Sequence, residues 1–289
     1  MFNKIFINLI VFFLFTFSFN YSHAANVGLG VSEIERLFNL AIEGDSEAAN
    51  KLLNLAENGD SLAQAQIGVC YLNGKGVDKD VDKAFSWFKK SAEAENIVGM
   101  NNLGTCYDSG IGTKIDYDKA IYWFSKSAEG GFVEAKYNLG VLYHFGRGVE
   151  VDLKKAAELY KEAAKENYPD ALTNLGILYL TGQGVEKNPK EAFGLIMKAA
   201  MMGAPNAIYN LAICYLKGDG TGESPELAIA WLQKGASLDD PSCIFMLGQC
   251  FEEGIGVTKS IDEAKVLYNK AAELGIEDAK QRLLNLNNK

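Results

Sequence analysis

Residues 132–167 read FVEAKYNLGVLYHFGRGVEVDLKKAAELYKEAAKEN, and the pattern of this stretch recurs along most of the 289-residue chain. Its Gly146-x-Gly148 pair is one of six such pairs, each 36 residues from the next; they begin at Gly74, Gly110, Gly146, Gly182, Gly218 and Gly254. A fixed period of about 20–50 residues is the sequence signature of a repeat architecture. The register predicts six uninterrupted units, with the boundaries 60–95, 96–131, 132–167, 168–203, 204–239 and 240–275.

Each unit contains two segments with helical periodicity. In the first unit, Ala63, Ile67 and Tyr71 are spaced i, i+4 and i+8, as on one face of a helix, and Ala84 and Phe88 begin the same spacing later in the unit. The Gly-x-Gly turn between the segments supplies residues that adopt positive φ. A residue type that caps helix N-termini well precedes the second segment of every unit. These residues are Asp80, Asp116, Asp152, Asn188, Ser224 and Ser260.

The helix pairs are expected to stack. One pair cannot bury its apolar face alone, so neighbouring pairs must cover one another. The sequence therefore predicts an all-α fold, a right-handed α/α superhelical solenoid of helix-hairpin repeats. Residues 25–59 are expected to form an N-terminal capping helix pair, and residues 276–289 a C-terminal capping helix and tail.

The N-terminal segment has the layout of a secretory signal peptide. Lys4 precedes an almost wholly apolar run over residues 5–19, and a small-residue Ser-x-Ala end follows it. The alternative is an uncleaved membrane anchor, but a run of this length falls short of the roughly 20 residues that cross a bilayer. We predict a leader over residues 1–24 with cleavage after Ala24, and an exported, periplasmic or secreted monomer that keeps no stable membrane anchor.

Composition argues against several classes of function. The net charge is -9, whereas nucleic acids and anionic lipids select cationic surfaces. Only two His are present, and His23 falls in the predicted leader, which leaves little room for a metal site or a catalytic triad built on His. His144 is expected to be a surface or partly packed residue. We therefore expect no enzyme activity, no cofactor, no metal and no nucleic-acid partner.

Five cysteines in an exported chain raise the alternatives of disulfides and buried thiols. Four of them share one helix position, which Leu fills in the two remaining units; the four are Cys70, Cys106, Cys214 and Cys250. Equivalent points on stacked units lie roughly 8–10 Å apart, whereas a disulfide needs Cα atoms within about 7 Å. The pattern favours buried free thiols.

The repeat resembles that of the Sel1-like repeat family, a relative of the tetratricopeptide repeat with a longer loop between its helices. The resemblance rests on the pattern Ala-x-x-x-Leu-Gly-x-x-Tyr-x-x-Gly-x-Gly-Val followed by Asp-x-x-Lys-Ala-x-x-Trp-Phe-x-Lys-Ala-Ala-Glu-x-Gly, which covers residues 60–275 in full and 276–286 in part. Departures are mild: Thr113 and Thr221 replace the Val, and Ala212 replaces the first Gly. Cys243 resembles one half of the helix-to-helix bridge in cysteine-rich members, but Ala236 fills the partner position.

The resemblance implies an adaptor or scaffold that binds proteins, and a role of secreted bacterial members in the cell envelope or in host contact. It also implies that the first helix of each unit lines a concave groove, where a protein or an extended peptide would bind. Carboxamide side chains at a 36-residue period could bond a peptide backbone there, or could instead bond neighbouring helices and lock the stack. The candidate ligand-binding residues are Asn102, Asn138, Asn174, Asn210, Tyr137, Tyr209 and Phe245.

A second column of groove positions lacks the Lys and Arg that tetratricopeptide domains use to hold a carboxylate. It consists of Leu62, Val98, Glu134, Asp170, Asn206 and Ser242, so we expect no binding of acidic C-terminal tails. Two alternatives to a scaffold remain at this point: a hydrolase acting on cell-wall material or a β-lactam, and a purely structural envelope component. No Walker motif and no His-Glu-x-x-His sequence favours the enzyme.

Overall fold

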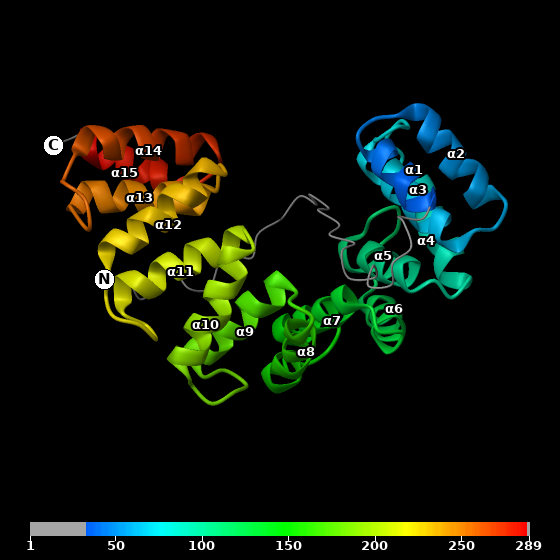
Figure 1. The fold of residues 1–289 in the computed structure, drawn as a ribbon, viewed down its shortest axis with the longest axis horizontal. Helices are drawn as coiled ribbons and strands as arrows, with labels where there is room; N and C mark the ends of the chain where they lie inside the picture. Colours follow the sequence, from blue (N-terminus) through cyan, green and yellow to red (C-terminus); the bar gives the residue numbers. More distant parts are fainter. Residues whose placement is uncertain (1–32, 288–289) are drawn as a thin grey trace.

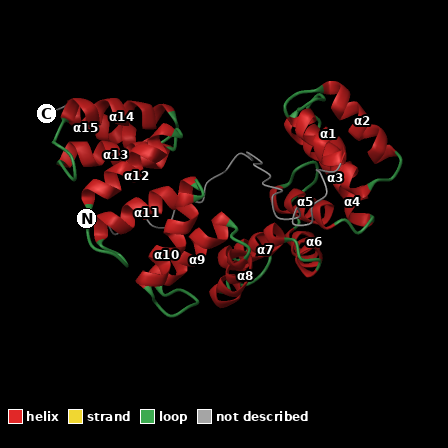
Figure 2. Ribbon diagram, viewed as in Figure 1, coloured by secondary structure: helices red, strands yellow, loops and turns green. Residues whose placement is uncertain are grey.

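The structure, a computed structural model, describes residues 33–287, so the predicted leader lies outside the described residues. Within that range the chain forms fifteen α-helices and no strand (Figure 2). The helices are α1 (Glu33–Ile42), α2 (Ser46–Glu57), α3 (Ser61–Asn73), α4 (Val81–Glu93), α5 (Ile97–Ser109), α6 (Tyr117–Glu129), α7 (Val133–Phe145), α8 (Leu153–Lys165), α9 (Pro169–Thr181), α10 (Pro189–Met201), α11 (Pro205–Lys217), α12 (Pro225–Ser237), α13 (Pro241–Glu253), α14 (Ile261–Glu273) and α15 (Glu277–Asn287). The predicted all-α class is confirmed.

The helices form a row of consecutive hairpins that bends into an open arc (Figure 1). Each helix packs against the next one along the chain, and the first helices of some neighbouring repeats also contact each other, namely α3 with α5, α9 with α11 and α11 with α13. These direct contacts place the first helices on the short, concave side of the bend. We call the surface that α3, α5, α7, α9, α11 and α13 present there the inner face. In the middle of the arc α7 packs less closely against α5 and α9 than α3 packs against α5.

Caps explain where most of the second helices begin. The Asp80 carboxylate accepts a hydrogen bond from the Lys83 backbone N–H at 2.9 Å, and the corresponding residues at the starts of α6, α8, α10 and α14 bond in the same way. Ser224 is the exception, because its side chain makes no hydrogen bond to α12. The prediction of a side-chain cap there is wrong, and nothing in the structure explains the difference.

The second glycine of each Gly-x-Gly turn is required by a close approach between repeats. Gly112 has φ of 63°, and a Cβ placed on it would lie 2.6 Å from the carbonyl oxygen of Val81 at the start of α4. Gly184, Gly220 and Gly256 approach the first residue of the preceding repeat's second helix in the same manner. The turn therefore does more than reverse the chain: it fixes the spacing of successive hairpins.

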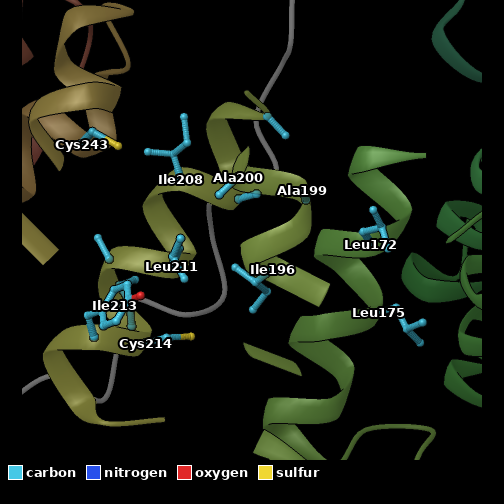
Figure 3. Close-up of a cluster of buried hydrophobic side chains, with 14 of the residues drawn as sticks. Leu172, Leu175, Ile196, Ala199, Ala200, Ile208, Leu211, Ile213, Cys214 and Cys243 are labelled. Carbon is cyan, nitrogen blue, oxygen red and sulfur yellow. The ribbon is translucent and has the colours of Figure 1, made fainter. Parts of the chain in front are cut away.

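Small residues in the first helices make room for large ones in the second. A Cβ on Gly104 would lie 2.7 Å from the ring of Phe124, and Gly140 faces the ring of Tyr160 equally closely. Ala and Leu side chains then fill the core between repeats, as in the cluster around Leu172, Ile196 and Leu211 (Figure 3). All five cysteines lie in this kind of environment, buried and unpaired. No helix in the range 33–287 is long and apolar enough to cross a membrane.

Candidate functional site

The predicted carboxamide column does not behave uniformly along the inner face. Asn102 on α5 is only 2% exposed, and neither atom of its amide finds a hydrogen-bond partner among the described residues. Gln66, at the same position of α3, is also 2% exposed and without a partner. The direct contact between α3 and α5 closes over this part of the column, so these two amides are not displayed to a ligand.

Asn138 belongs to a network between two repeats. Its Nδ2 donates to Oδ1 of Asn101 at 3.0 Å, and Nδ2 of Asn101 donates to Oε1 of Glu134 at 3.3 Å. Asn101 is fully buried, whereas Asn138 and Glu134 are half-buried. The network links α5 to α7, as expected if an asparagine of this column bonds a neighbouring helix and stabilises the stack. Part of Asn138 and part of Glu134 still remain exposed.

The two remaining asparagines differ from Asn138. Asn174 on α9 lies near the phenol groups of Tyr137 and Tyr160, where its amide opposes the rise that burial causes in the pKa of both. Asn210 on α11 donates to the backbone oxygen of Asn206 in its own helix at 2.7 Å. The predicted ladder thus consists of two enclosed amides, one amide that links two repeats, one that lies near tyrosine hydroxyls and one that bonds its own helix. Whether any of them binds a ligand stays a prediction.

Aromatic side chains gather on the inner face at repeats three and four. The ring of Tyr137 lies 5.1 Å from that of Tyr168 and 5.7 Å from that of Tyr160, measured between centroids. The Tyr160 hydroxyl lies 3.3 Å from Nδ1 of His144. His144 is therefore partly packed, as expected, and burial lowers its pKa. The other two predicted aromatic residues lie elsewhere: Tyr209 is half-buried on α11, and Phe245 packs on the ring of Tyr268 at 5.5 Å.

Two carboxyl groups adjoin this aromatic group. Glu134 lies in the first turn of α7 and Asp170 in the first turn of α9. Burial raises the pKa of Glu134 to about 7, the negative charge of Asp170 adds to the rise, and the hydrogen bond from Asn101 opposes it. Burial also raises the pKa of Asp170. Among the described residues, neither carboxyl group has a Lys or Arg partner within ion-pair distance.

A small cavity opens beside Glu134 between α5 and α7. It has a volume of about 100 Å³ and is lined by Thr105, Asp108, Ser109, Phe124, Glu134, Asn138, Val141 and Leu142. Its second carboxylate, Asp108, is already paired, because Arg147 reaches back from the turn after α7 and places Nη1 3.1 Å from Oδ2 of Asp108. Of the two carboxyl groups that line the cavity, Glu134 is thus the one that forms no ion pair with a Lys or Arg of the described residues.

From the sequence, Glu134 and Asp170 are predicted only to belong to a groove column without Lys or Arg, and no role is predicted for Tyr168. A signal for Tyr168 exists in the repeat register. Asp60, Asn96 and Asp240 cap their helices at this position, whereas Phe132, Tyr168 and Ala204 make no capping hydrogen bond; the first two of these are aromatic. An aromatic residue where a cap is favoured marks a place at which another interaction outweighs local helix stability.

A metal site or a reactive cysteine among the described residues would be an alternative to the inner face. Within residues 33–287, no three side chains among His, Cys, Asp and Glu come together as a metal site would require. The cysteines are unsuited to nucleophilic chemistry, because burial raises the pKa of both Cys106 and Cys214 to about 12. The inner face around α5, α7 and α9 is therefore the candidate site.

The fold and this inner face define an α-solenoid of helical hairpins with a concave side. The family model for the Sel1 repeat matches residues 61–96, 97–132, 133–168, 169–203, 205–240 and 241–276. The chain belongs to the Sel1 repeat family, and it is a Sel1-repeat scaffold protein. The predicted six repeats are confirmed.

Solved structures place the chain among bacterial relatives. It is 30% identical to a Sel1 repeat protein from Oxalobacter formigenes, with a TM-score of 0.75 over 83% of this chain and 99% of that one. It is 31% identical, with a TM-score of 0.68 over 81% of its length, to c5321, described as a protective antigen present in uropathogenic Escherichia coli strains; it spans only 50% of that protein. An immunity protein from Pseudomonas aeruginosa, Pa5087, shares the fold at 20% identity and a TM-score of 0.51, over 74% of this chain and 81% of that one. A comparison with curated protein sequences gives no significant match.

Proposed function

We propose that this Sel1-repeat protein is a non-catalytic scaffold that is exported after cleavage near Ala24 and holds a protein or an extended peptide on its inner face. The observation that carries the proposal is the group of half-buried polar and aromatic side chains at the middle of the arc, on α7 and around its ends. A concave row of helices with such side chains suits an elongated ligand. The leader predicted from residues 1–24 and the likeness to a bacterial antigen support a role in the periplasm, in the envelope or in contact with a host.

Site-specific photo-cross-linking in cells tests the proposal. A photoreactive amino acid at Thr105 of α5, which lines the cavity beside Glu134, lies at the candidate site, and the same amino acid at Asp118, in the first turn of α6, serves as the control away from it. A scaffold should give a discrete adduct from position 105 that position 118 does not give, in the exported fraction of the cells. Equal adducts from both positions, or none from either, would contradict it; the second result would favour the purely structural role.

One observation favours a second candidate, the hydrolase. Burial and the charge of Asp170 raise the pKa of Glu134 to about 7, a property that the general acids of glycoside hydrolases share. The test is turnover of a peptidoglycan fragment, and of a chromogenic β-lactam, by the purified protein and by its Glu134→Gln variant. The scaffold proposal expects no turnover by either; turnover that disappears in the variant would establish the enzyme instead.

A further inference from the structure

The carboxyl groups of Glu134 and Asp170 have no Lys or Arg partner within ion-pair distance among the described residues. The basic residues nearest to this part of the inner face are engaged elsewhere: Arg147 pairs with Asp108, and Nζ of Lys136 lies 3.3 Å from Oε2 of Glu162. The hydrogen bond that Glu134 receives from Asn101 comes from a neutral amide. A cation from outside the chain would be the natural partner of such a pair of carboxylates.

The solenoid itself does not require carboxyl groups at these positions. The corresponding residues of the other four repeats are Leu62, Val98, Asn206 and Ser242, none of which can carry a negative charge. Burial opposes ionisation of both Glu134 and Asp170, so each tends to destabilise the folded state at neutral pH. Residues that act against folding in this way are expected where the protein contacts something else.

Tyr137 and Tyr168 extend the same surface with aromatic area. Their ring centroids lie 5.1 Å apart. Tyr168 stands at the N-terminus of α9, where the equivalent residues Asp60, Asn96 and Asp240 of other repeats form a capping hydrogen bond that Tyr168 does not form. Aromatic faces attract ammonium and guanidinium groups, with the strongest effect where water is partly excluded. Both rings are half-buried, which meets that condition.

The cavity between α5 and α7 has room for the end of a basic side chain. Its volume of about 100 Å³ is roughly three times the share of one water in the liquid. Besides Glu134, it offers the side-chain oxygens of Asn138 and Thr105 as acceptors for N–H donors. An acidic side chain entering the same space would meet Glu134 and Asp108 and would be repelled.

We propose that the acidic inner site, formed by Glu134, Asp170, Tyr137, Tyr168 and Asn138, holds a lysine or arginine side chain of the polypeptide bound on the inner face. The inference rests on the proposed function and specifies the chemistry of the partner. The ammonium or guanidinium group donates hydrogen bonds to the Glu134 carboxylate in the cavity, the negative charge of Asp170 adds to the attraction, and the alkyl chain packs against the tyrosine rings.

An immobilised peptide array tests the site directly. The probes are acetylated and amidated nonapeptides that differ only at the central residue, which is Lys, Arg, Gln or Glu, each on several neutral flanking sequences. The mature protein, residues 25–289, is applied at pH 8.5 and low salt. The affinities of the retained peptides are then measured by titration. The test variant is Glu134→Gln with Asp170→Asn, and the matched control is Glu129→Gln with Asp118→Asn, two acidic residues of α6 that remove the same charge away from the site.

We expect wild type and control to bind the Lys and Arg peptides at least tenfold more tightly than their Gln counterparts, and the Glu peptides most weakly. The test variant should lose this preference while still retaining peptides, and its circular dichroism should remain that of a folded helical protein. Retention of peptides by wild type without a preference for Lys or Arg would overturn this inference alone. A preference that survives in the test variant would overturn it too, whereas no retention of any peptide by wild type would overturn the proposed function with it.

Discussion

Glu134 links the stability of the molecule to pH. Its pKa of about 7 compares with an ordinary value of 4.5, so between these pH values the folded state holds a proton that the unfolded state releases. The free energy of unfolding should therefore fall as pH rises from about 4.5 to about 7, and then level off. Among the surrounding groups, Asp170 strengthens the effect through its charge and the amide of Asn101 weakens it.

The Glu134→Gln variant should remove this loss, because an amide of the same shape does not ionise. At pH 8.5 we expect the variant to be more stable than wild type by about 1–2 kcal/mol, a value reduced for the partial exposure of the side chain. At pH 4 the two should agree within about 0.5 kcal/mol. Urea unfolding at both pH values measures the difference. Glu129→Gln is the exposed control, and a gain for Glu134→Gln that is equal at both pH values would contradict the account.

The cysteines give a second prediction at the scale of single residues. All five are buried and free, and burial raises the pKa of Cys70 to about 12 and that of Cys250 to about 11. The thiolate fraction at pH 8 is therefore very small, and the folded chain should react slowly with a thiol reagent. After unfolding without reductant, the same reagent should find five thiols per chain. A count of three or fewer would show that disulfides form.

At the scale of the elements, turns between the helices of a repeat carry the spacing of the solenoid. Gly112 combines a φ of 63° with a close approach to the Val81 carbonyl, so a Cβ is disfavoured by both its own backbone and its neighbour. Ala cannot relieve the second contact by turning, because the Cβ position is fixed by the backbone. The glycine is therefore needed for the packing of two repeats as well as for the turn.

Gly112→Ala should lower the free energy of unfolding by about 2 kcal/mol or more, since strain in the left-handed region and a steric clash add together. The control is Gly194→Ala in α10, where a Cβ would meet nothing within 4 Å. That change should instead stabilise the chain by about 0.5–1 kcal/mol, because Ala favours a helix interior. Thermal and urea unfolding of both variants check the opposite signs; two losses of similar size would contradict the role of the turn.

At the scale of the whole molecule, contacts run almost entirely between neighbours along the chain. Stability is then close to a sum over repeats and the interfaces between them. Removing one complete repeat should leave a shorter arc that still folds, because the flanking helices meet through equivalent surfaces. The third and fourth repeats, which carry the proposed acidic inner site, can in this way be separated from the repeats that lie outside it.

Deletion of residues 205–240 should give a folded protein with a lower urea m-value, because less surface is exposed on unfolding. Its affinity for the Lys and Arg peptides should stay within about twofold of wild type, since Glu134, Tyr168 and Asp170 are untouched. Deletion of residues 133–168 removes part of the acidic inner site and should abolish the preference for basic residues. Circular dichroism and peptide titration measure both properties, and loss of the preference in both deletions would contradict the placement of the site.

The amino-acid sequence by itself determined the helical hairpins, their number and most of their caps. These features depend on residues a few positions apart, such as Asp80 and Lys83, so local spacing is enough to predict them. The burial of the shared cysteine position could also be predicted from the sequence, because a side chain repeated every 36 residues meets a similar environment in each repeat.

Only the tertiary structure decided what the inner-face residues do. Asn102, Asn138, Asn174 and Asn210 are one residue type at one repeat position, yet their surroundings differ. Asn102 is enclosed, Asn138 bonds the preceding repeat, Asn174 lies near two tyrosines and Asn210 bonds its own helix. Their partners come from neighbouring helices whose separation changes along the arc, and a periodic pattern does not contain that separation. The same holds for Glu134, whose carboxyl group is made unusual by burial and by the charge of a residue 36 positions away, Asp170.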